Sequence, residues 1–379
     1  MIPTLGYLYP WDVVGDPAAA DRIAALGLSG VALAGVYHAT RTFTPRHPAR
    51  RVVTADRSAA YFPLDTSPLG LGADPTDSFG TAAATLSAAA VPVTAWAVLL
   101  HVDGLPADPV VVNAYGDRYP YALCAANPEA IGYARTVAAA MAARPDLAAL
   151  ELEACGWYGY AHLHAHDKTA GVPVSAAADF LLSLCFCATC QRGYAAVGLD
   201  PRWLRTQVTG ALDRTFAGEG EPGLPEWAAV EAMLGEQIAA AVLEFRDSAG
   251  DSLRAEVIGA VRAVAADLPV LLHADVRPHR SGANTGLSVP AALRVADGLV
   301  VNCWDPAASA PAVAAVAAAA AGTARVVASL LAVRGMGGAP DSLGDQLAAA
   351  AQAGATEARL YHVGLAGAAD LAAVHAALA

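Results

Sequence analysis

Short apolar runs alternate with longer helix-like segments along the whole chain. Eight runs are apolar on both faces, at residues 4–9, 30–38, 93–102, 148–154, 270–276, 298–304, 324–333 and 358–363. Helix-like segments lie between them, among them 18–26, 77–90, 128–143, 289–296, 307–321, 342–353 and 368–378. This alternation is typical of a parallel sheet covered by helices. Eight such units predict an α/β fold of the (β/α)8 TIM-barrel type. The first turn lacks a Gly-rich phosphate-binding motif, which argues against an open dinucleotide-binding sheet.

Two connections are much longer than the others. Residues 155–268 separate the fourth and fifth apolar runs and contain helix-like segments joined by polar loops, while residues 39–75 follow the second run. In a TIM barrel both connections lie at the C-terminal face, where active sites are found. We therefore predict one TIM-barrel domain over residues 1–379, with a long helical insertion after the fourth strand at 155–268.

Composition limits the classes of function. Hydrophobic residues make up 56% of the chain and charged residues 15%, as in a globular protein with a large core. The net charge of -12 repels phosphate groups, so nucleic acids and membrane surfaces are not expected partners. The longest alanine-rich apolar run, 311–321, is about half a bilayer span. The first residues do not resemble a signal peptide, so we expect a cytoplasmic protein. The alanine-rich outer helices are compatible with a subunit interface in a homo-oligomer.

Three cysteines are closely spaced in the long insertion. Cys185, Cys187 and Cys190 lie within six residues. A Cys-x-Cys pair is too close for an easy disulfide, but thiolates at this spacing can surround a tetrahedral ion. A closed structural zinc site needs a fourth ligand from elsewhere in the chain. The alternative is that these are small thiols buried in the core.

This region resembles the barrel domain of glycoside hydrolase family 42, the β-galactosidases with a four-cysteine zinc site. In that family a lone cysteine opens the helix after strand three, and a Cys-x-Cys-x-x-Cys motif follows the glutamate of strand four. Here a cysteine precedes Asn127, Pro128 and Glu129, and the cysteine triplet follows Glu153. The resemblance covers roughly residues 90–280. It implies a carbohydrate substrate and a structural Zn²⁺ bound by Cys124, Cys185, Cys187 and Cys190.

The catalytic part of the family pattern is incomplete. Glu153 ends the fourth run, where the family carries its acid/base glutamate, but Leu152 precedes it where the family has Asn. The family's nucleophilic glutamate ends strand seven, whereas residues 324–335 contain no carboxylate. The chain also has no room for the additional C-terminal domains of the family. The resemblance therefore implies the scaffold and the zinc site but not the complete retaining mechanism.

Two glutamates share one face of the fourth strand. Because side chains alternate along a strand, Glu151 and Glu153 point the same way, and Glu153 stands nearer the C-terminal end. We predict that Glu153 is the general acid/base, a role that suits one of two neighbouring carboxylates because like charge raises one pKa. Glu151 is either a second catalytic group or a hydrogen-bonded residue inside the barrel.

Glycoside hydrolysis requires a second carboxylate on the other side of the bond. Asp275, at the end of the fifth run, is our first candidate. Asp305, after the sixth run, is the second. Asp305 also precedes Pro306, so it is equally suited to cap the next helix.

Histidine, aromatic and amide side chains gather at the other strand ends. The predicted substrate-binding residues are His38, His101, Trp157, Tyr158, His273, Asn302, Trp304 and His362. Their rings can stack on sugars and their nitrogens can bond hydroxyl groups. The alternative for the histidines is a second divalent metal ion at the barrel mouth. The loop after strand four adds His162, His164 and His166, which are either metal ligands or exposed loop residues.

Three functions are compatible with these residues. The first is a glycosidase that hydrolyses a small glycoside or oligosaccharide. The second is a metal-dependent barrel isomerase, epimerase or lyase that acts on a sugar-like substrate. The third is a catalytically inactive barrel that binds carbohydrate, which the missing strand-seven glutamate favours.

Overall fold

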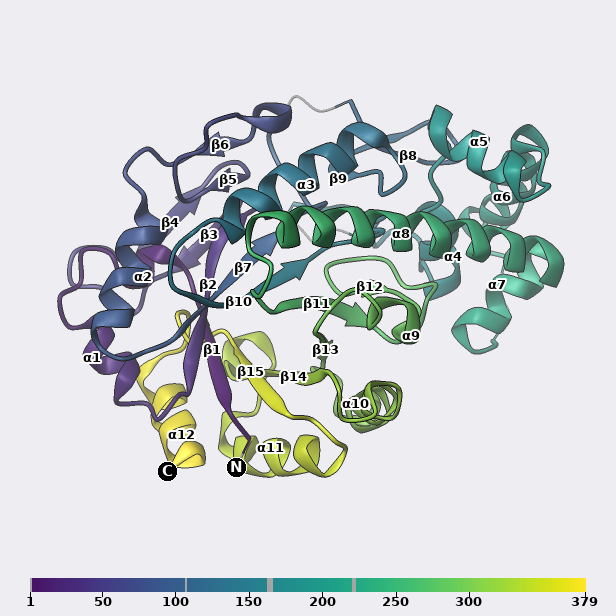
Figure 1. Cartoon of the computed structure of the whole chain (residues 1–379). Coiled ribbons are helices and arrows are strands. Elements are labelled where there is room, and N and C mark those ends of the chain that lie inside the picture. Colours follow the sequence, from purple (N-terminus) through teal and green to yellow (C-terminus); the bar gives the residue numbers. More distant parts are fainter. Residues whose placement is uncertain (1, 106–107, 162–165, 220–222) are drawn as a thin grey trace.

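Eight parallel strands close into a barrel in the residues that the computed structural model describes, 2–105, 108–161, 166–219 and 223–379 (Figure 1). The strands are β1 (Thr4–Leu8), β2 (Gly30–Tyr37), β7 (Val93–Val98), β10 (Leu147–Glu153), β11 (Val270–Asp275), β13 (Gly298–Asn302), β14 (Arg325–Leu331) and β15 (Glu357–Tyr361). Each pairs in parallel with its neighbours, and β1 pairs with both β2 and β15. The predicted TIM barrel is therefore confirmed, and each predicted run overlaps one barrel strand, with bounds that differ by a residue at the start of β10 and β15.

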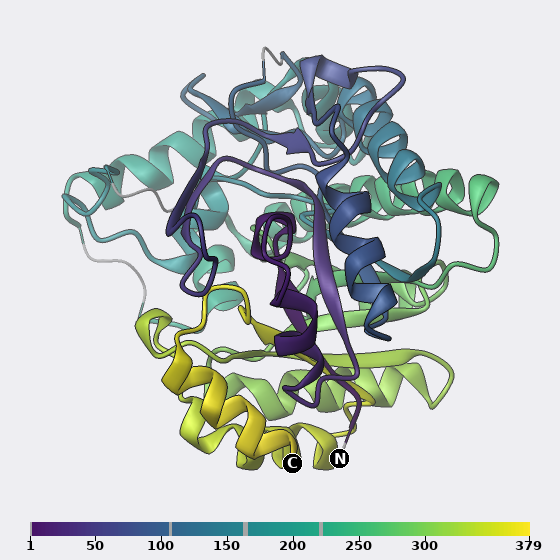
Figure 2. The ribbon, with the colours of Figure 1, turned by 90° about the vertical axis from the view of Figure 1, so that its left-hand side faces the viewer.

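Helices surround the barrel and connect successive strands. They are α1 (Ala19–Ala24), α2 (Ser78–Ala88), α3 (Pro128–Ala142), α9 (Val289–Ala292), α10 (Pro306–Ala320), α11 (Leu343–Gln352) and α12 (Ala368–Leu378). Several begin at the polar caps that the sequence contains. The Asn127 side chain accepts a hydrogen bond from the Glu129 amide at the start of α3, with Pro128 in the first turn. The two chain ends lie near each other beside α12 (Figure 2).

The connection from β10 to β11 is a long helical segment. It contains α4 (Ala176–Leu182), α5 (Ala188–Ala196), α6 (Pro201–Phe216), α7 (Glu226–Leu234) and α8 (Glu236–Val264). Helix α8 packs along α3 and occupies the place of the barrel helix before β11 (Figure 1). Helices α4 to α7 pack on one another at one side of the barrel.

Short strands decorate the C-terminal end of the barrel. After β2, the hairpin of β3 (Thr40–Phe43) and β4 (Val52–Ala55) is followed by β5 (Ala59–Ala60) and β6 (Gly72–Ala73), and β5 pairs with β2. A second hairpin, β8 (Val110–Val112) and β9 (Arg118–Leu123), precedes α3, and β12 (Thr285–Gly286) pairs with β11. Among the described residues, none of the helices combines the length and apolarity needed to cross a bilayer.

The barrel interior changes from apolar to polar along the strands. Leu271, Val300 and Val327 are fully buried and form a small apolar cluster of their own. Because side chains alternate, the residue two positions further along each of these strands faces the same interior. Those residues are His273, Asn302 and Ser329, and all of them line a cavity. The polar end of the barrel is therefore the C-terminal one.

Candidate active site

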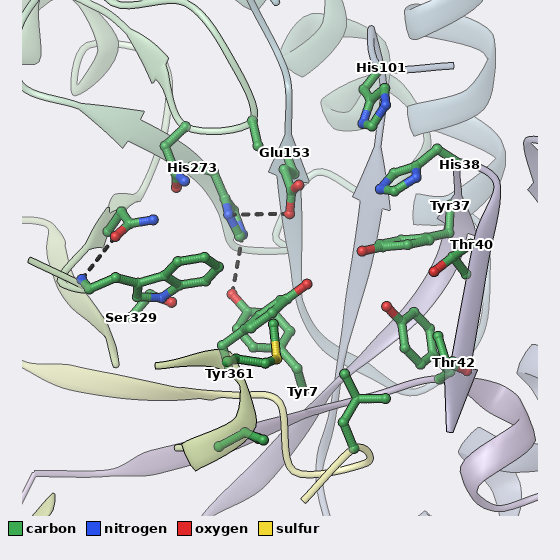
Figure 3. Close-up of a pocket in the computed structure, with 18 of the residues that line it drawn as sticks. Tyr7, Tyr37, His38, Thr40, Thr42, His101, Glu153, His273, Ser329 and Tyr361 are labelled. Atoms are coloured by element: carbon green, nitrogen blue, oxygen red, sulfur yellow. Dashed lines mark hydrogen bonds and ion pairs between the residues drawn. The ribbon is translucent and has the colours of Figure 1, made fainter. Parts of the chain in front are cut away.

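A cavity of about 770 Å³ opens at the C-terminal end of the barrel (Figure 3). Side chains from different strands and loops meet around it. They include Tyr7, Tyr37, His38, Thr40, Thr42, His101, Glu153, Tyr158, His273, Asn302, Trp304, Ser329 and Tyr361. Glu153 is the one carboxylate among the described lining residues. A concave site of this size with few polar groups is typical of small-molecule binding.

Glu153 is the last residue of β10, and its carboxyl group lies in the cavity wall beside His273 (Figure 3). The indole N–H of Trp96 donates a hydrogen bond to its Oε2 at 2.8 Å. Burial raises the pKa of Glu153, and the nearby charge of Glu151 adds to this, although His273 and Trp96 act in the opposite direction. A carboxyl group with a raised pKa retains a proton to higher pH, as a general acid requires.

Glu151 lies one pleat below and is fully buried. Its Oε1 accepts a 2.6 Å hydrogen bond from Arg359 Nε, and its Oε2 accepts one from the Tyr7 hydroxyl at 2.9 Å. Burial alone would raise the pKa of Glu151, but the Arg359 charge and the His273 hydrogen bond outweigh it and lower the pKa to about 2. Of its two predicted roles, Glu151 therefore has the geometry of the hydrogen-bonded residue inside the barrel.

His273 stands between the two glutamates. Its Nε2 is 3.3 Å from Glu151 Oε2, and its Nδ1 is 3.6 Å from Glu153 Oε2. The Tyr7 hydroxyl is also 3.3 Å from Nε2 (Figure 3). An imidazole held this way links the buried Arg359–Glu151 pair to the cavity carboxyl group.

Four aromatic rings form a column at one side of the mouth. The rings of His38 and His101 are tilted by 31° with their centroids 3.9 Å apart. Tyr37 stacks on the outer face of His38 at 4.2 Å, and Tyr158 stacks on the outer face of His101 at 4.2 Å. The carboxylate of Asp103 is 3.9 Å from a nitrogen of each histidine.

Exposed apolar side chains also line the mouth of the cavity. Trp304 is 41% exposed and packs against Tyr361 with centroids 4.9 Å apart. Phe43, at the end of β3, is 68% exposed and also lines the cavity. Exposed rings at the entrance of a polar cavity offer flat apolar surfaces to a ligand.

Two predicted substrate-binding residues lie elsewhere. The Trp157 ring is buried under the Arg246 guanidinium, 4.7 Å from its centroid, and its N–H donates to the Arg246 carbonyl oxygen. His362 is fully buried against Tyr9, and burial followed by the Arg46 charge lowers its pKa to about 3. Neither is among the described lining residues, since the Trp157 ring packs against Arg246 and the His362 ring lies beneath the lining residue Tyr9.

Neither candidate for the second carboxylate is among the described lining residues. Asp275 makes two hydrogen bonds of 2.9 and 2.6 Å with the Arg277 guanidinium. Asp305 caps α10, where its side chain accepts a hydrogen bond from the Ala307 amide at 3.0 Å. The structure thus places Asp305 in its alternative role as a helix cap. His162 and His164, from the loop after β10, lie outside the described residues.

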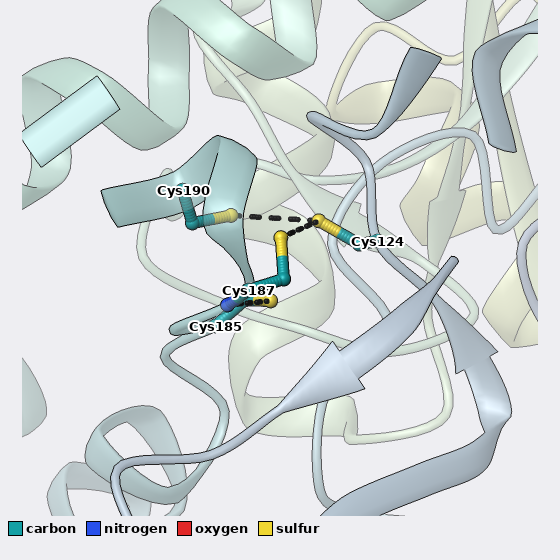
Figure 4. Close-up of side chains that lie close together, drawn as sticks. All are labelled: Cys124, Cys185, Cys187 and Cys190. Atoms are coloured by element: carbon teal, nitrogen blue, oxygen red, sulfur yellow. Dashed lines mark hydrogen bonds between the residues drawn. The ribbon is translucent and has the colours of Figure 1, made fainter. Parts of the chain in front are cut away.

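Four cysteines converge behind the site (Figure 4). The sulfur atoms of Cys124, Cys185, Cys187 and Cys190 all lie within 4.8 Å of one another. Cys124 Sγ is 3.4 Å from Cys190 Sγ and 3.8 Å from Cys187 Sγ. Four Zn–S bonds of about 2.3 Å in a tetrahedron separate the sulfur atoms by about 3.8 Å. The cluster therefore fits a tetrahedral metal ion and would join the segment before α3 to the segment before α5.

Several functional positions were not predicted from the sequence. Tyr7, Tyr37, Tyr361 and Ser329 line the cavity, and Arg359 neutralises Glu151. Arg359 did leave a signal, because it is the charged residue within an otherwise mostly apolar strand segment. The tyrosines left none, since a tyrosine in a strand is equally suited to the core.

Comparison with known proteins identifies the fold. No protein-family model matches the sequence, and the search of curated proteins finds no relative. The glycoside hydrolase domain of PgaB (BpsB) from Bordetella bronchiseptica superposes with a TM-score of 0.61 at 17% identity, covering 100% of this chain and 99% of that one. The catalytic domain of β-amylase from Paenibacillus polymyxa gives 0.57 at 12% identity, covering 99% and 97%.

A β-galactosidase from Halorubrum lacusprofundi gives a TM-score of 0.56 at 9% identity, covering 100% of this chain and 57% of that one. The chain therefore has the TIM-barrel fold of glycoside hydrolase domains. No comparison supports family 42 in particular, so that resemblance depends on the cysteine pattern and the strand-four glutamate.

Proposed function

We propose that this protein is a glycoside hydrolase that acts on a small glycoside or oligosaccharide, with Glu153 as the general acid/base. The observation that carries the proposal is the position of Glu153. It is the carboxyl group that reaches the described cavity wall at the C-terminal end of the barrel, and burial raises its pKa. The glycoside hydrolase fold of the structural neighbours supports the same reaction class.

In the proposed reaction, neutral Glu153 donates its proton to the glycosidic oxygen as the bond to the anomeric carbon breaks. If Asp275 attacks the anomeric carbon, the Glu153 carboxylate then accepts a proton from the water molecule that displaces Asp275. If Asp275 instead deprotonates the attacking water, Glu153 acts as the acid alone. His273 Nδ1, 3.6 Å from Glu153 Oε2, favours the carboxylate form of Glu153 and so assists proton donation. The Trp96 N–H holds the carboxyl group in place.

The second carboxylate is proposed to be Asp275. It lies on the same face of β11 as His273, one pleat nearer the rim of the barrel. To reach a substrate, its carboxylate must exchange its Arg277 contact for the sugar or for a water molecule. Asp305 is the second choice because its side chain already caps α10.

The cavity wall suits an uncharged sugar. Tyrosine hydroxyls, Asn302 and Ser329 can exchange hydrogen bonds with sugar hydroxyls, and the exposed ring of Trp304 can cover an apolar sugar face. The volume lies within the range of about 300–1,000 Å³ that is typical of small-ligand sites. We also propose that the four clustered cysteines bind a structural Zn²⁺ that braces the segments beside the site.

The test is hydrolysis of a panel of α- and β-linked aryl glycosides and short oligosaccharides by wild type, Glu153→Gln and the surface control Glu129→Gln. We expect wild type and E129Q to hydrolyse at least one substrate. E153Q should lose at least about 100-fold in kcat, since general acid/base catalysis contributes about 10²–10⁴-fold. An E153Q enzyme as active as wild type would contradict the assignment of Glu153, and a wild type without turnover on any glycoside would contradict the proposed function.

A further inference from the structure

We propose that His38, His101 and Asp103 form a second metal site, for a divalent ion of the Zn²⁺ class, at the mouth of the cavity. The site is distinct from the four-cysteine cluster, which shares none of its residues. His38 directly follows β2, and His101 and Asp103 lie in the segment after β7. Both histidines line the cavity that contains Glu153 (Figure 3).

The three side chains bring their ligand atoms together. One nitrogen or oxygen from each lies within 4.8 Å of those of the other two. Bonds of about 2.0–2.2 Å around a tetrahedral ion place ligand atoms about 3.4 Å apart. The Asp103 carboxylate oxygen, 3.9 Å from a nitrogen of each histidine, lies about half an ångström beyond this spacing, so only a small contraction is needed to bind an ion.

The donor set is that of a transition-metal site. Two imidazoles and one carboxylate suit Zn²⁺, Fe²⁺, Co²⁺ or Ni²⁺, whereas Mg²⁺ and Ca²⁺ favour oxygen ligands alone. The neutral imidazole is the form of histidine that binds a metal ion.

The surroundings hold this cluster in place before any ion binds. Tyr37 and Tyr158 confine the two imidazoles from either side, so neither ring can swing out of the column. Asp103 is fixed by reciprocal bonds with Ser58. Its amide donates to Ser58 Oγ at 2.8 Å, and its carbonyl oxygen accepts from the Ser58 amide at 2.8 Å. Such pre-arranged ligands reduce the entropy lost when an ion binds.

The cavity side of the cluster is where further ligands would enter. An ion bound to three protein groups keeps open positions, and the hydroxyl groups of a sugar in the cavity could fill them. This role rests on the proposed function, whereas binding of the ion does not. The ion would then contribute to holding the substrate, and its loss would raise KM more than it lowers kcat.

The experiment is a count of bound zinc. Wild type, His101→Gln, Asp103→Asn and the surface control His375→Gln are stripped with a chelator, reloaded with excess Zn²⁺, freed of unbound metal and analysed for zinc. We expect two zinc ions per chain in wild type and H375Q, and one in H101Q and D103N. Cys187→Ser removes a ligand of the four-cysteine cluster, so its zinc content shows which ion that cluster binds. Circular dichroism establishes that each variant is folded.

A wild type that retains only one zinc ion, or an H101Q and a D103N that both retain two, would overturn the proposal. If H101Q fails to fold, the zinc content of D103N still tests the proposal. Reloading with Co²⁺ gives a second readout, because thiolate ligands produce intense charge-transfer bands and the histidine–carboxylate site does not. Since these measurements require no substrate, a failure of the glycosidase assignment leaves the metal count interpretable.

Discussion

Arg359 compensates the buried negative charge of Glu151. Both side chains are fully buried, and their contact is 2.6 Å. A buried pair of this kind adds little net stability, but removal of one partner leaves the other charge uncompensated. The same pair holds the negative charge that helps to raise the pKa of Glu153.

We predict that Arg359→Met lowers the free energy of unfolding by about 3–5 kcal/mol, because Glu151 is left without its counter-charge. Urea unfolding at neutral pH measures the change. The double variant E151Q/R359M should be more stable than R359M, since it removes both charges. A double variant that is less stable than R359M would contradict the uncompensated charge of Glu151 as the cause of the loss.

A second prediction concerns His273 and the pH profile of the proposed activity. His273 lowers the pKa of Glu153, so His273→Gln should raise that pKa. A general acid must be protonated, and kcat/KM therefore falls as pH rises through its pKa. The alkaline limb of the profile should move to higher pH in H273Q and stay in place in the surface control H375Q. A limb that moves to lower pH would contradict the assigned direction.

At the scale of elements, two connections depend on one cluster of thiols. Cys124 lies between β9 and α3, and the other three cysteines lie between α4 and the first turn of α5. The Val112 amide on β8 also donates to Cys185 Sγ at 3.4 Å, so the β8–β9 hairpin is attached to the same cluster. A metal ion here would hold these elements together in addition to the hydrophobic core, which contains buried residues from each of them.

We predict that Cys187→Ser lowers the free energy of unfolding by about 3 kcal/mol or more, as is usual when a structural metal is lost. Cys303→Ser is the matched control, because Cys303 is a buried free cysteine outside the cluster. Thermal unfolding with and without chelator measures both variants. Chelator should destabilise wild type and C303S but have little further effect on C187S. Equal behaviour of wild type and C187S would argue against a structural metal.

At the scale of the whole molecule, the buried side chains of His362 and Asp12 change the pH dependence of the free energy of unfolding in opposite directions. His362 stays neutral in the folded protein, with its pKa lowered from 6.5 to about 3. Below pH 6.5 the unfolded chain binds the extra proton, so stability falls as pH falls. Asp12 stays protonated in the folded protein, with its pKa raised by burial from 3.8 to about 7. Its stabilising contribution is lost as pH rises through that range.

The two contributions cancel between roughly pH 4 and 6.5, each with a slope of about 1.4 kcal/mol per pH unit. We predict that the free energy of unfolding of His362→Leu decreases with rising pH in this window, because only the Asp12 contribution remains. The free energy of unfolding of Asp12→Asn should increase with rising pH, because only the His362 contribution remains. Urea unfolding at several pH values measures the slopes relative to wild type. Two variants whose slopes change in the same direction would contradict the opposite protonation states of these groups.

The sequence predicted the barrel because its signal is local. Each barrel strand is apolar on both faces, and each is followed by a segment with helical periodicity or a long insertion. Strand alternation also placed Glu151 and Glu153 on one face, and the structure has both inside the barrel. Helix α8 shows the limit of such reasoning. The long connection was predicted as an insertion, but only packing against α3 shows that its last helix belongs to the barrel wall.

The sequence by itself determined the strand and helix order, the number of barrel units and the spacing of the cysteine triplet, because these depend on residues near one another in the chain. Only the tertiary structure decided which polar groups meet. Glu151 and Arg359 are separated by 208 residues, and His38 and His101 lie in the segments after two different strands. It also placed the rings of Trp157 and His362 outside the described cavity lining, because distant residues, Arg246 and Tyr9, pack against those rings.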